Sequence, residues 1–204
     1  MSALTESPSA LAITLQNILN ADYDWQDTLI DEDDYDALFI AAMLDFLQKN
    51  SPEARQKLAL SWNFDNAPEI LDWVISQPDT DKGTILYLYW YLQPGFQKKF
   101  LDRKACEQES SWYLPTFDLL DKIEHQFCNS FYRDQKYDFS PQYDIYQEGY
   151  NWTSELEPET FKRTIPGEML IPVTGEILEN PEWDEGVPHE LIPVMDRLYD
   201  LLED

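Results

Sequence analysis

The chain has 204 residues, of which 43% are hydrophobic and 14% aromatic, so it can bury a core and is too apolar for global disorder. It carries 40 acidic and 14 basic residues, which gives a net charge of −26. A charge of this size repels phosphates, which argues against binding to nucleic acid or to an anionic membrane, whereas it attracts cationic proteins.

The acidic excess is concentrated in two flanks. Residues 1–48 contain ten acids and no Lys or Arg, and residues 164–204 contain eleven acids and one Arg. The middle, residues 49–163, is nearly balanced, with nineteen acids and thirteen bases. Two interpretations stay open: the excess provides solubility, or the two flanks form one face that meets a basic partner.

The cysteines and the apolar runs indicate a cytoplasmic protein. Cys106 and Cys128 are too far apart for a metal knuckle, and a reduced state fits them better than the one disulfide they could form. The N-terminal residues lack a basic segment typical of a signal peptide, and no apolar run approaches the length of a membrane span.

The first part of the chain is predicted to be helical. Apolar residues recur at helical spacing over residues 10–19 and 33–48. Ser and Pro at the start of residues 51–62 indicate another helix, with Ser51 as its cap. Asn66 is expected to cap the helix that follows and ends before Pro78.

The longest apolar run, residues 85–92, is ambiguous between a strand and a buried helix. We favour a central buried helix from about Lys82, because the neighbouring segments are helical and Asp79 and Asp81 offer caps. Two more helices are predicted over residues 96–107 and 112–132, the first of them basic.

The texture changes after Arg133, where aromatic residues stand among polar residues, prolines and glycines. Two short apolar runs within residues 161–178 have room for one small hairpin, and the chain closes with an amphipathic helix. We therefore expect a mainly α-helical, single compact multi-helix domain. Its helical body would span residues 1–132, and residues 133–204 would form an irregular, aromatic-rich extension packed on that body.

Catalytic and metal-binding patterns are weak in this sequence. His125 and Cys128 lie one helical turn apart, but nothing nearby suggests an orienting group or an oxyanion hole. A calcium loop would need Gly where Asp27 stands and Glu where Asp33 stands. No glycine-rich phosphate loop is present. We expect no enzyme, no cofactor and no metal site.

The acidic, aromatic segment before the second helix is the best candidate for an interface. Carboxylates accelerate the encounter with a basic partner, and aromatic rings provide the anchors that make an interface tight. The alternative is a solvated loop that only caps a helix. The candidate interface residues are Asp22, Tyr23, Asp24, Trp25, Asp27, Asp31, Glu32, Asp33, Asp34, Tyr35 and Asp36.

Residues 58–96 also carry a family resemblance. They contain a Trp-Asn-x-Asp turn, an apolar helix with a central Trp, and a Gln-Pro-x-x-Asp segment that leads into an apolar helix containing Thr. In this pattern the chain resembles an uncharacterised bacterial family, the domain of unknown function numbered 4274. The family often has Cys where Thr80 stands, so no cysteine chemistry carries over. The residues that match, to which we assign structural roles, are Trp62, Asn63, Asp65, Trp73, Gln77, Pro78, Asp81, Thr84 and Trp90.

The resemblance implies a kind of partner. Members of the family look like small acidic proteins encoded beside secreted polymorphic toxins, where a cognate immunity protein is expected. The hypothesis is therefore a cytoplasmic immunity protein, or antitoxin. It would use an acidic surface to bind and neutralise a basic antibacterial toxin that is encoded nearby. The alternatives are a non-enzymatic helical adaptor or peptide-binding domain, with a groove lined by Trp62, Trp73 and Trp90, and a metal-dependent enzyme that uses the aspartates.

Overall fold

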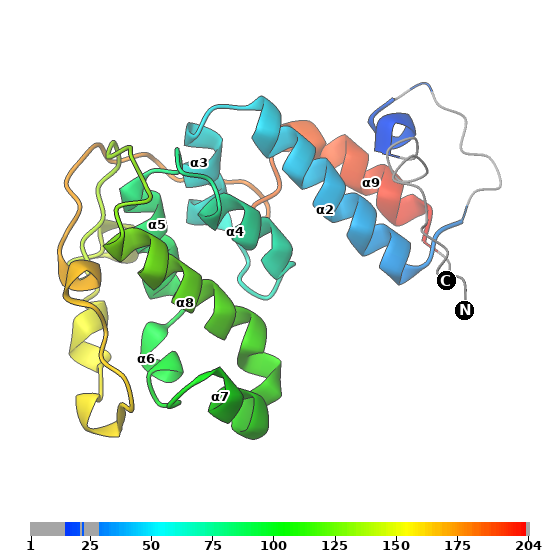
Figure 1. Ribbon diagram of the computed structural model, residues 1–204. Coiled ribbons are helices and arrows are strands. Elements are labelled where there is room, and N and C mark those ends of the chain that lie inside the picture. The colour runs from blue at the N-terminus through cyan, green and yellow to red at the C-terminus, as the bar shows by residue number, and fades with distance from the viewer. Residues whose placement is uncertain (1–14, 21, 23–28, 203–204) are drawn as a thin grey trace. The chain divides into compact units, whose positions relative to one another are not determined.

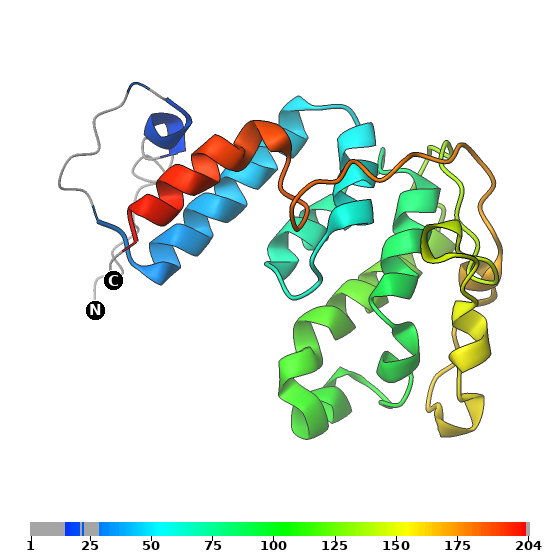
Figure 2. The same ribbon diagram turned by 180° about the vertical axis from the view of Figure 1, so that it is seen from behind.

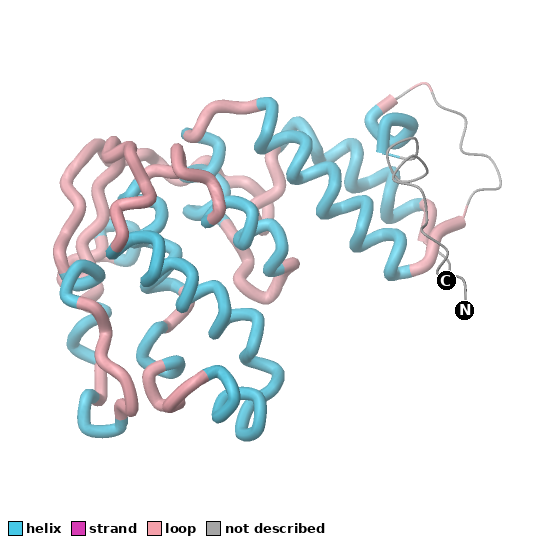
Figure 3. The backbone as a smooth tube through the Cα atoms, viewed as in Figure 1, coloured by secondary structure: helices cyan, strands magenta, loops and turns pink. Residues whose placement is uncertain are grey.

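The computed structural model describes residues 15–20, 22 and 29–202, and within them it confirms a mainly α-helical protein (Figure 1). In these residues Figure 3 shows helices and loops, and the β-pairing consists of isolated bridges. The α-helices with described bounds are α2 (Glu32–Lys49), α3 (Glu53–Ser61), α4 (Pro68–Ile75), α5 (Lys82–Tyr91), α6 (Pro94–Gln97), α7 (Arg103–Ser110), α8 (Leu114–Cys128) and α9 (Ile192–Asp200).

The chain divides into two compact units. Unit 1 combines Met1–Asn50 with Val187–Asp204, and unit 2 is Ser51–Gly186. Described residues before position 51 and after position 186 therefore belong to the same unit, and the change of sequence composition after residue 132 falls inside unit 2.

Unit 1 is built on the pairing of α2 with α9. The two helices lie side by side, with the start of α2 beside the end of α9 (Figure 1), and a β-bridge between Ile30 and Leu202 fixes that end. The guanidinium of Arg197 donates to the carbonyl oxygen of Ile18 at 2.7 Å. The buried apolar residues of the unit are Ile18, Ile30, Leu38, Ala42, Met43, Leu47, Leu191, Val194, Leu198 and Leu201.

Unit 2 is organised around α5. Every residue from Gly83 to Trp90 is buried, because α5 packs against α3 and α8 and is covered by the later chain. The longest apolar run is therefore a helix, as expected. Asp81 caps it, accepting a hydrogen bond from the Gly83 N–H at 2.7 Å.

Two predicted helix caps were wrong by one residue. α4 begins at Pro68, so its N-cap is Ala67, which makes no side-chain cap, and Asn66 lies outside the helix. Proline is favoured at the first helical position. With Pro68 in that position, the N-cap is the residue directly before it, Ala67. In α3 the N-cap is likewise Pro52, where Ser51 had been expected.

The single helix predicted over residues 96–107 is also wrong. The chain forms α6, leaves helical geometry, and starts α7 with the Asp102 carboxylate capping the Ala105 N–H at 2.8 Å. The Lys98 carbonyl oxygen accepts from the Lys162 N–H at 2.7 Å. Because this carbonyl oxygen accepts from a distant segment, it does not take part in the regular hydrogen bonds that a continuous helix over residues 96–107 would need.

Residues 133–186 pack on the helices of unit 2 (seen from both sides in Figures 1 and 2). The bridges of this segment join Phe139 to Val173, Tyr137 to Glu176 and Asp144 to Tyr150, so none of them pairs two residues within 161–178. The backbone of Tyr137 packs closely against α5 at Gly83. A Cβ atom added to Gly83 would lie only 2.2 Å from the Tyr137 carbonyl oxygen, so this packing requires glycine.

Candidate functional site

Of the acidic interface segment, the structure describes Asp22 and the residues from Leu29 onward. Tyr23, Asp24, Trp25 and Asp27 lie outside the described residues, and Asp22 is exposed. From Asp31 to Asp36 every acid is exposed, and Tyr35 is half-buried.

Helix capping accounts for the first acids of α2. The Asp31 carboxylate accepts from the Asp34 N–H at 2.8 Å, and Glu32, Asp33 and Asp34 occupy the first turn. Negative charge at a helix N-terminus is favourable, since unpaired N–H groups and the helix dipole make that end positive. These residues would therefore be acidic even without a partner.

Helix stability does not account for the acid at the end of α9. Asp200 is the last residue of α9, at the negative end of the helix dipole, where a carboxylate is unfavourable. The end of α9 lies beside the start of α2, so this charge adds to the α2 acids. Burial raises the pKa of the Tyr35 hydroxyl, and Asp36 and Tyr199 raise it further, which places both tyrosines in this acidic region.

Two exposed apolar side chains flank these carboxylates. Tyr199 is 70% exposed and Leu29 is 61% exposed. We call this region the acidic end of unit 1, and it consists of Leu29, Asp31, Glu32, Asp33, Asp34, Asp36, Tyr199 and Asp200. Charged residues around exposed apolar anchors are typical of a surface that docks a protein.

The acidic end has no cation of its own. Over the described part of unit 1 the ion pair that forms is Lys49 with Asp45, at 2.7 Å, and the guanidinium of Arg197 faces the Ile18 carbonyl. Unit 1 as a whole has 15 acids and only these 2 bases. A partner would therefore have to supply the positive charge.

The residues of the family motif hold unit 2 together. Trp62 and Trp90 are buried, and the Trp90 indole donates to the Met169 carbonyl oxygen at 3.0 Å. Trp73 is half-buried, with the Arg55 guanidinium 5.1 Å from its ring centre. The Thr84 hydroxyl donates to the Gln56 amide oxygen at 2.6 Å.

The turns of the motif have similar roles. Asn63 forms a turn by accepting from the Asp65 N–H at 3.0 Å, and the Gln77 amide donates to the Trp73 carbonyl at 3.0 Å. The Pro78 carbonyl accepts from the Arg133 N–H at 3.1 Å. Asp81 is 2% exposed, and besides capping α5 it accepts from the backbone N–H groups of residues 136 and 137.

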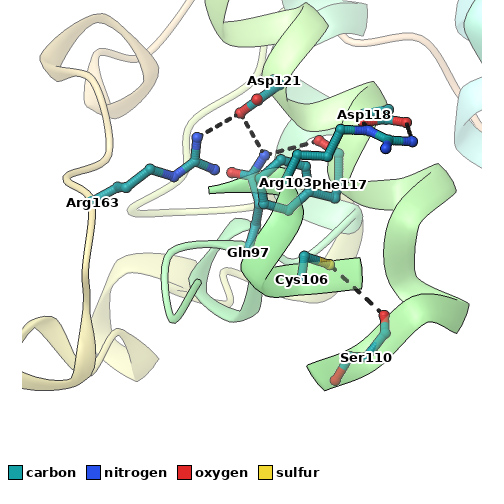
Figure 4. A network of polar contacts seen from close by, with 8 residues as sticks. All are labelled: Gln97, Arg103, Cys106, Ser110, Phe117, Asp118, Asp121 and Arg163. Carbon is teal, nitrogen blue, oxygen red and sulfur yellow. Dashed lines mark hydrogen bonds and ion pairs between the residues drawn. The ribbon is translucent and has the colours of Figure 1, made fainter. Parts of the chain in front are cut away.

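The hydrogen bonds between residues 161–163 and the helices were not predicted from the sequence. The Arg163 guanidinium donates to Asp121 at 2.9 Å, and the Gln97 amide donates to the same carboxylate oxygen at 3.0 Å (Figure 4). Arg163 also stacks over the Phe117 ring at 4.8 Å. Nearby, the buried Lys98 ammonium lies 2.5 Å from the Glu124 carboxylate. Aspartates, glutamates and lysines at these positions are visible in the sequence, but their partners are distant along the chain.

The thiols do not have the character of nucleophiles. Partial desolvation raises the pKa of the Cys128 thiol, and the Glu168 carboxylate raises it further, whereas an activated thiol needs a lowered pKa. Cys106 is buried and its Sγ lies 3.8 Å from the Ser110 carbonyl oxygen. Over the part of the chain that is described, no group of three or more His, Cys, Asp or Glu side chains is arranged to hold a metal ion.

Comparison with known proteins finds a family match over part of the chain. Residues 50–128 match the family described as a domain of unknown function, DUF4274. The match contains the whole of residues 58–96 and supports the resemblance seen there. No curated protein and no solved structure matches the chain.

Proposed function

We propose that this protein is an immunity protein that binds and neutralises a cognate, basic, secreted antibacterial toxin, and that the acidic end of unit 1 is its binding surface. The toxin would be encoded nearby, and the complex would form in the cytoplasm. Neutralisation would need no catalytic group, because covering the active site of the toxin suffices.

The observation that carries this proposal is Asp200. It adds negative charge where the dipole of α9 disfavours it, next to the acidic start of α2. Charge that costs stability in the free protein is expected where a partner compensates for it. Tyr199 and Leu29 supply apolar area beside it.

The proposal also predicts where the complex forms. Among the helices that the structure describes, none combines the length and the apolar character that a membrane span requires. Cytoplasmic location itself is part of the proposal, and fractionation of cells that express the protein would test it.

Binding to the product of the neighbouring gene is the experiment that tests the proposal. The double variant Asp36→Lys/Asp200→Lys should weaken binding at least about ten-fold, mainly through a slower association rate that depends on salt. The matched control is Asp65→Lys/Glu159→Lys, which reverses two exposed acids of unit 2 and should change affinity by less than about two-fold.

Two results would overturn the proposal. One is a neighbouring product that is no toxin and does not bind. The other is an equal loss of affinity in both double variants, because it would trace binding to net charge and not to the acidic end.

The alternative of a peptide-binding adaptor needs another surface than the one suggested by the tryptophans. Trp62 and Trp90 are buried, and Arg55 lies over Trp73, so these rings offer little area to a peptide.

A further inference from the structure

A pocket of about 370 Å³ opens in unit 2 between α6 and residues 150–161. Its size lies at the lower end of the range for ligand pockets, which suits one side chain or a small head group better than a helix. The aromatic residues that line it are Trp90, Phe96, Tyr150, Trp152 and Phe161, and the charged ones are Lys99, Glu155 and Glu157.

Specific contacts hold the two walls of the pocket. Lys162 donates its backbone N–H to the Lys98 carbonyl at 2.7 Å, directly after the wall residue Phe161. Across the rim, the Lys99 ammonium lies 3.1 Å from the Glu157 carboxylate. On the outer wall the Trp152 indole donates to the buried Asp144 carboxylate at 2.9 Å, which fixes the ring. The pocket is therefore a defined part of the fold.

The rings of the pocket are only partly covered. Phe96, Tyr150, Trp152 and Phe161 are each half-buried, so part of each ring stays accessible. Tyr150 and Trp152 stand nearly perpendicular, with centroids 5.0 Å apart and an interplanar angle of 85°. Aromatic faces carry negative potential and attract cations that approach them.

The charges at the rim favour a cation as well. Lys99 neutralises Glu157, whereas the exposed Glu155 has no cationic partner among the residues that the structure describes. The Glu155 carboxylate interacts with the Tyr150 hydroxyl, whose pKa it raises through that hydrogen bond. One carboxylate beside several rings is complementary to one positive charge.

We propose that this pocket binds an arginine side chain presented by a protein partner. A guanidinium group is planar, so it can stack on an aromatic face while its N–H groups donate to the Glu155 carboxylate. The pocket belongs to unit 2 and the acidic end to unit 1, so this proposal does not rest on the proposed neutralisation of a toxin.

Titration of the whole protein with two short peptides tests the proposal. The probe is N-acetyl-Gly-Arg-Gly-amide, and its matched control replaces Arg with citrulline, which keeps the shape and removes the charge. The readout is the indole N–H signal of Trp152 in NMR, assigned with the variant Trp152→Phe. The arginine peptide should shift this signal and bind at least about ten-fold more tightly than the citrulline peptide. Equal affinity for the two peptides, or no shift with the arginine peptide at millimolar concentration, would overturn it.

A pair of variants locates the binding. The substitution Glu155→Gln should lower the affinity for the arginine peptide about five-fold. Glu159→Gln changes an exposed acid in the same segment that does not line the pocket, and it should change the affinity less than two-fold. An equal loss in both variants would show an effect of general charge and would contradict the assignment. A lysine peptide that binds as tightly as the arginine peptide would contradict the guanidinium-specific part.

Discussion

The two units of this protein treat their carboxylates in opposite ways. Unit 2 has 25 acids and 12 bases, and eight of the nine ion pairs of the described residues lie within it. Unit 1 has 15 acids and 2 bases, and one ion pair forms among those of its residues that the structure describes. Each unit is therefore acidic, but unit 2 uses many of its acids to hold its own helices and loops together.

The difference separates two uses of the same side chain. An acid with a buried partner contributes to stability, because removal of one member leaves an uncompensated charge. An acid that faces only water contributes little to stability and is free to attract a partner. Substitutions of paired and of unpaired acids should therefore have separable effects on stability and on binding.

Removal of the Glu124 carboxylate should destabilise the protein most. The Lys98 side chain is 1% exposed and Glu124 is 14% exposed, and Glu124 also accepts from the Tyr89 hydroxyl at 2.5 Å. Glu124→Ala would leave the Lys98 ammonium buried without a counter-charge, which should cost about 3–5 kcal/mol of unfolding free energy in urea denaturation. The control is Asp118→Ala, whose pair with Arg103 is exposed on both sides and should cost at most about 1 kcal/mol. Similar losses of unfolding free energy in Glu124→Ala and Asp118→Ala would contradict the distinction between buried and exposed ion pairs.

Substitution of Gly83 should have the next largest effect. Its missing Cβ lets the Tyr137 backbone pack against α5, and Gly83→Ala would force a carbonyl oxygen away from a position only 2.2 Å distant. We expect a loss of about 2 kcal/mol in thermal or urea unfolding. Gly167→Ala is the matched control, since nothing lies within 4 Å of its added carbon, and it should stay within about 0.5 kcal/mol of the parent protein. If Gly83→Ala were as stable as the parent protein, the Tyr137 backbone would not be packed tightly against α5.

Acid should remove part of the stability of unit 2 through Asp79. The hydrogen bond from the Arg55 guanidinium holds the pKa of the Asp79 carboxyl below its ordinary value. A carboxyl pKa that is lower in the folded state stabilises the fold at pH values above the unfolded pKa, about 4, and this contribution disappears as the pH falls through the folded pKa.

The variant Asp79→Asn isolates this contribution. It should be less stable than the parent protein at pH 7, and the difference should shrink below about pH 4. Unfolding free energies measured from pH 2 to pH 7 provide the test. A difference that is constant over this range would show that the ion pair with Arg55 contributes nothing.

The smallest change in stability is expected at Asp200, and its sign is the informative quantity. Asp200→Lys places a cation at the negative end of α9 and should raise the stability of the free protein by about 0.5 kcal/mol. The same variant should weaken binding to the proposed toxin. A loss of stability in the free protein would assign Asp200 a structural role and remove the main support for the acidic end.

Local signals in the sequence predicted the elements well where one residue decides the outcome. Asp81 was expected to cap the central helix, and it does so. Asn66 was expected to cap α4, but Pro68 at the first helical position makes Ala67 the cap. Which of two adjacent residues becomes the cap depends on backbone geometry that the side-chain pattern does not contain.

Contacts between distant residues could not be predicted in the same way. The acids at the start of α2 are visible in the sequence, but their proximity to Asp200 depends on how α2 and α9 pair. The sequence predicted an aromatic, irregular stretch that contains Tyr150 and Trp152, and it placed Phe161 in the segment with room for one small hairpin. That they form a concave site with α6 follows from contacts such as Lys162 with Lys98, which join segments more than sixty residues apart.

The carboxylate of Asp81 has a consequence for where a self-sufficient piece of this protein ends. One of its roles, the cap of α5, is complete within the segment that matches the family. Its remaining acceptor capacity is filled by the backbone of Lys136 and Tyr137, which follow that segment. Because an unsatisfied buried acceptor is costly, we expect the segment that matches the family to be shorter than the piece of polypeptide that can fold alone. During synthesis, the burial of α5 would be completed only after residue 137 has left the ribosome.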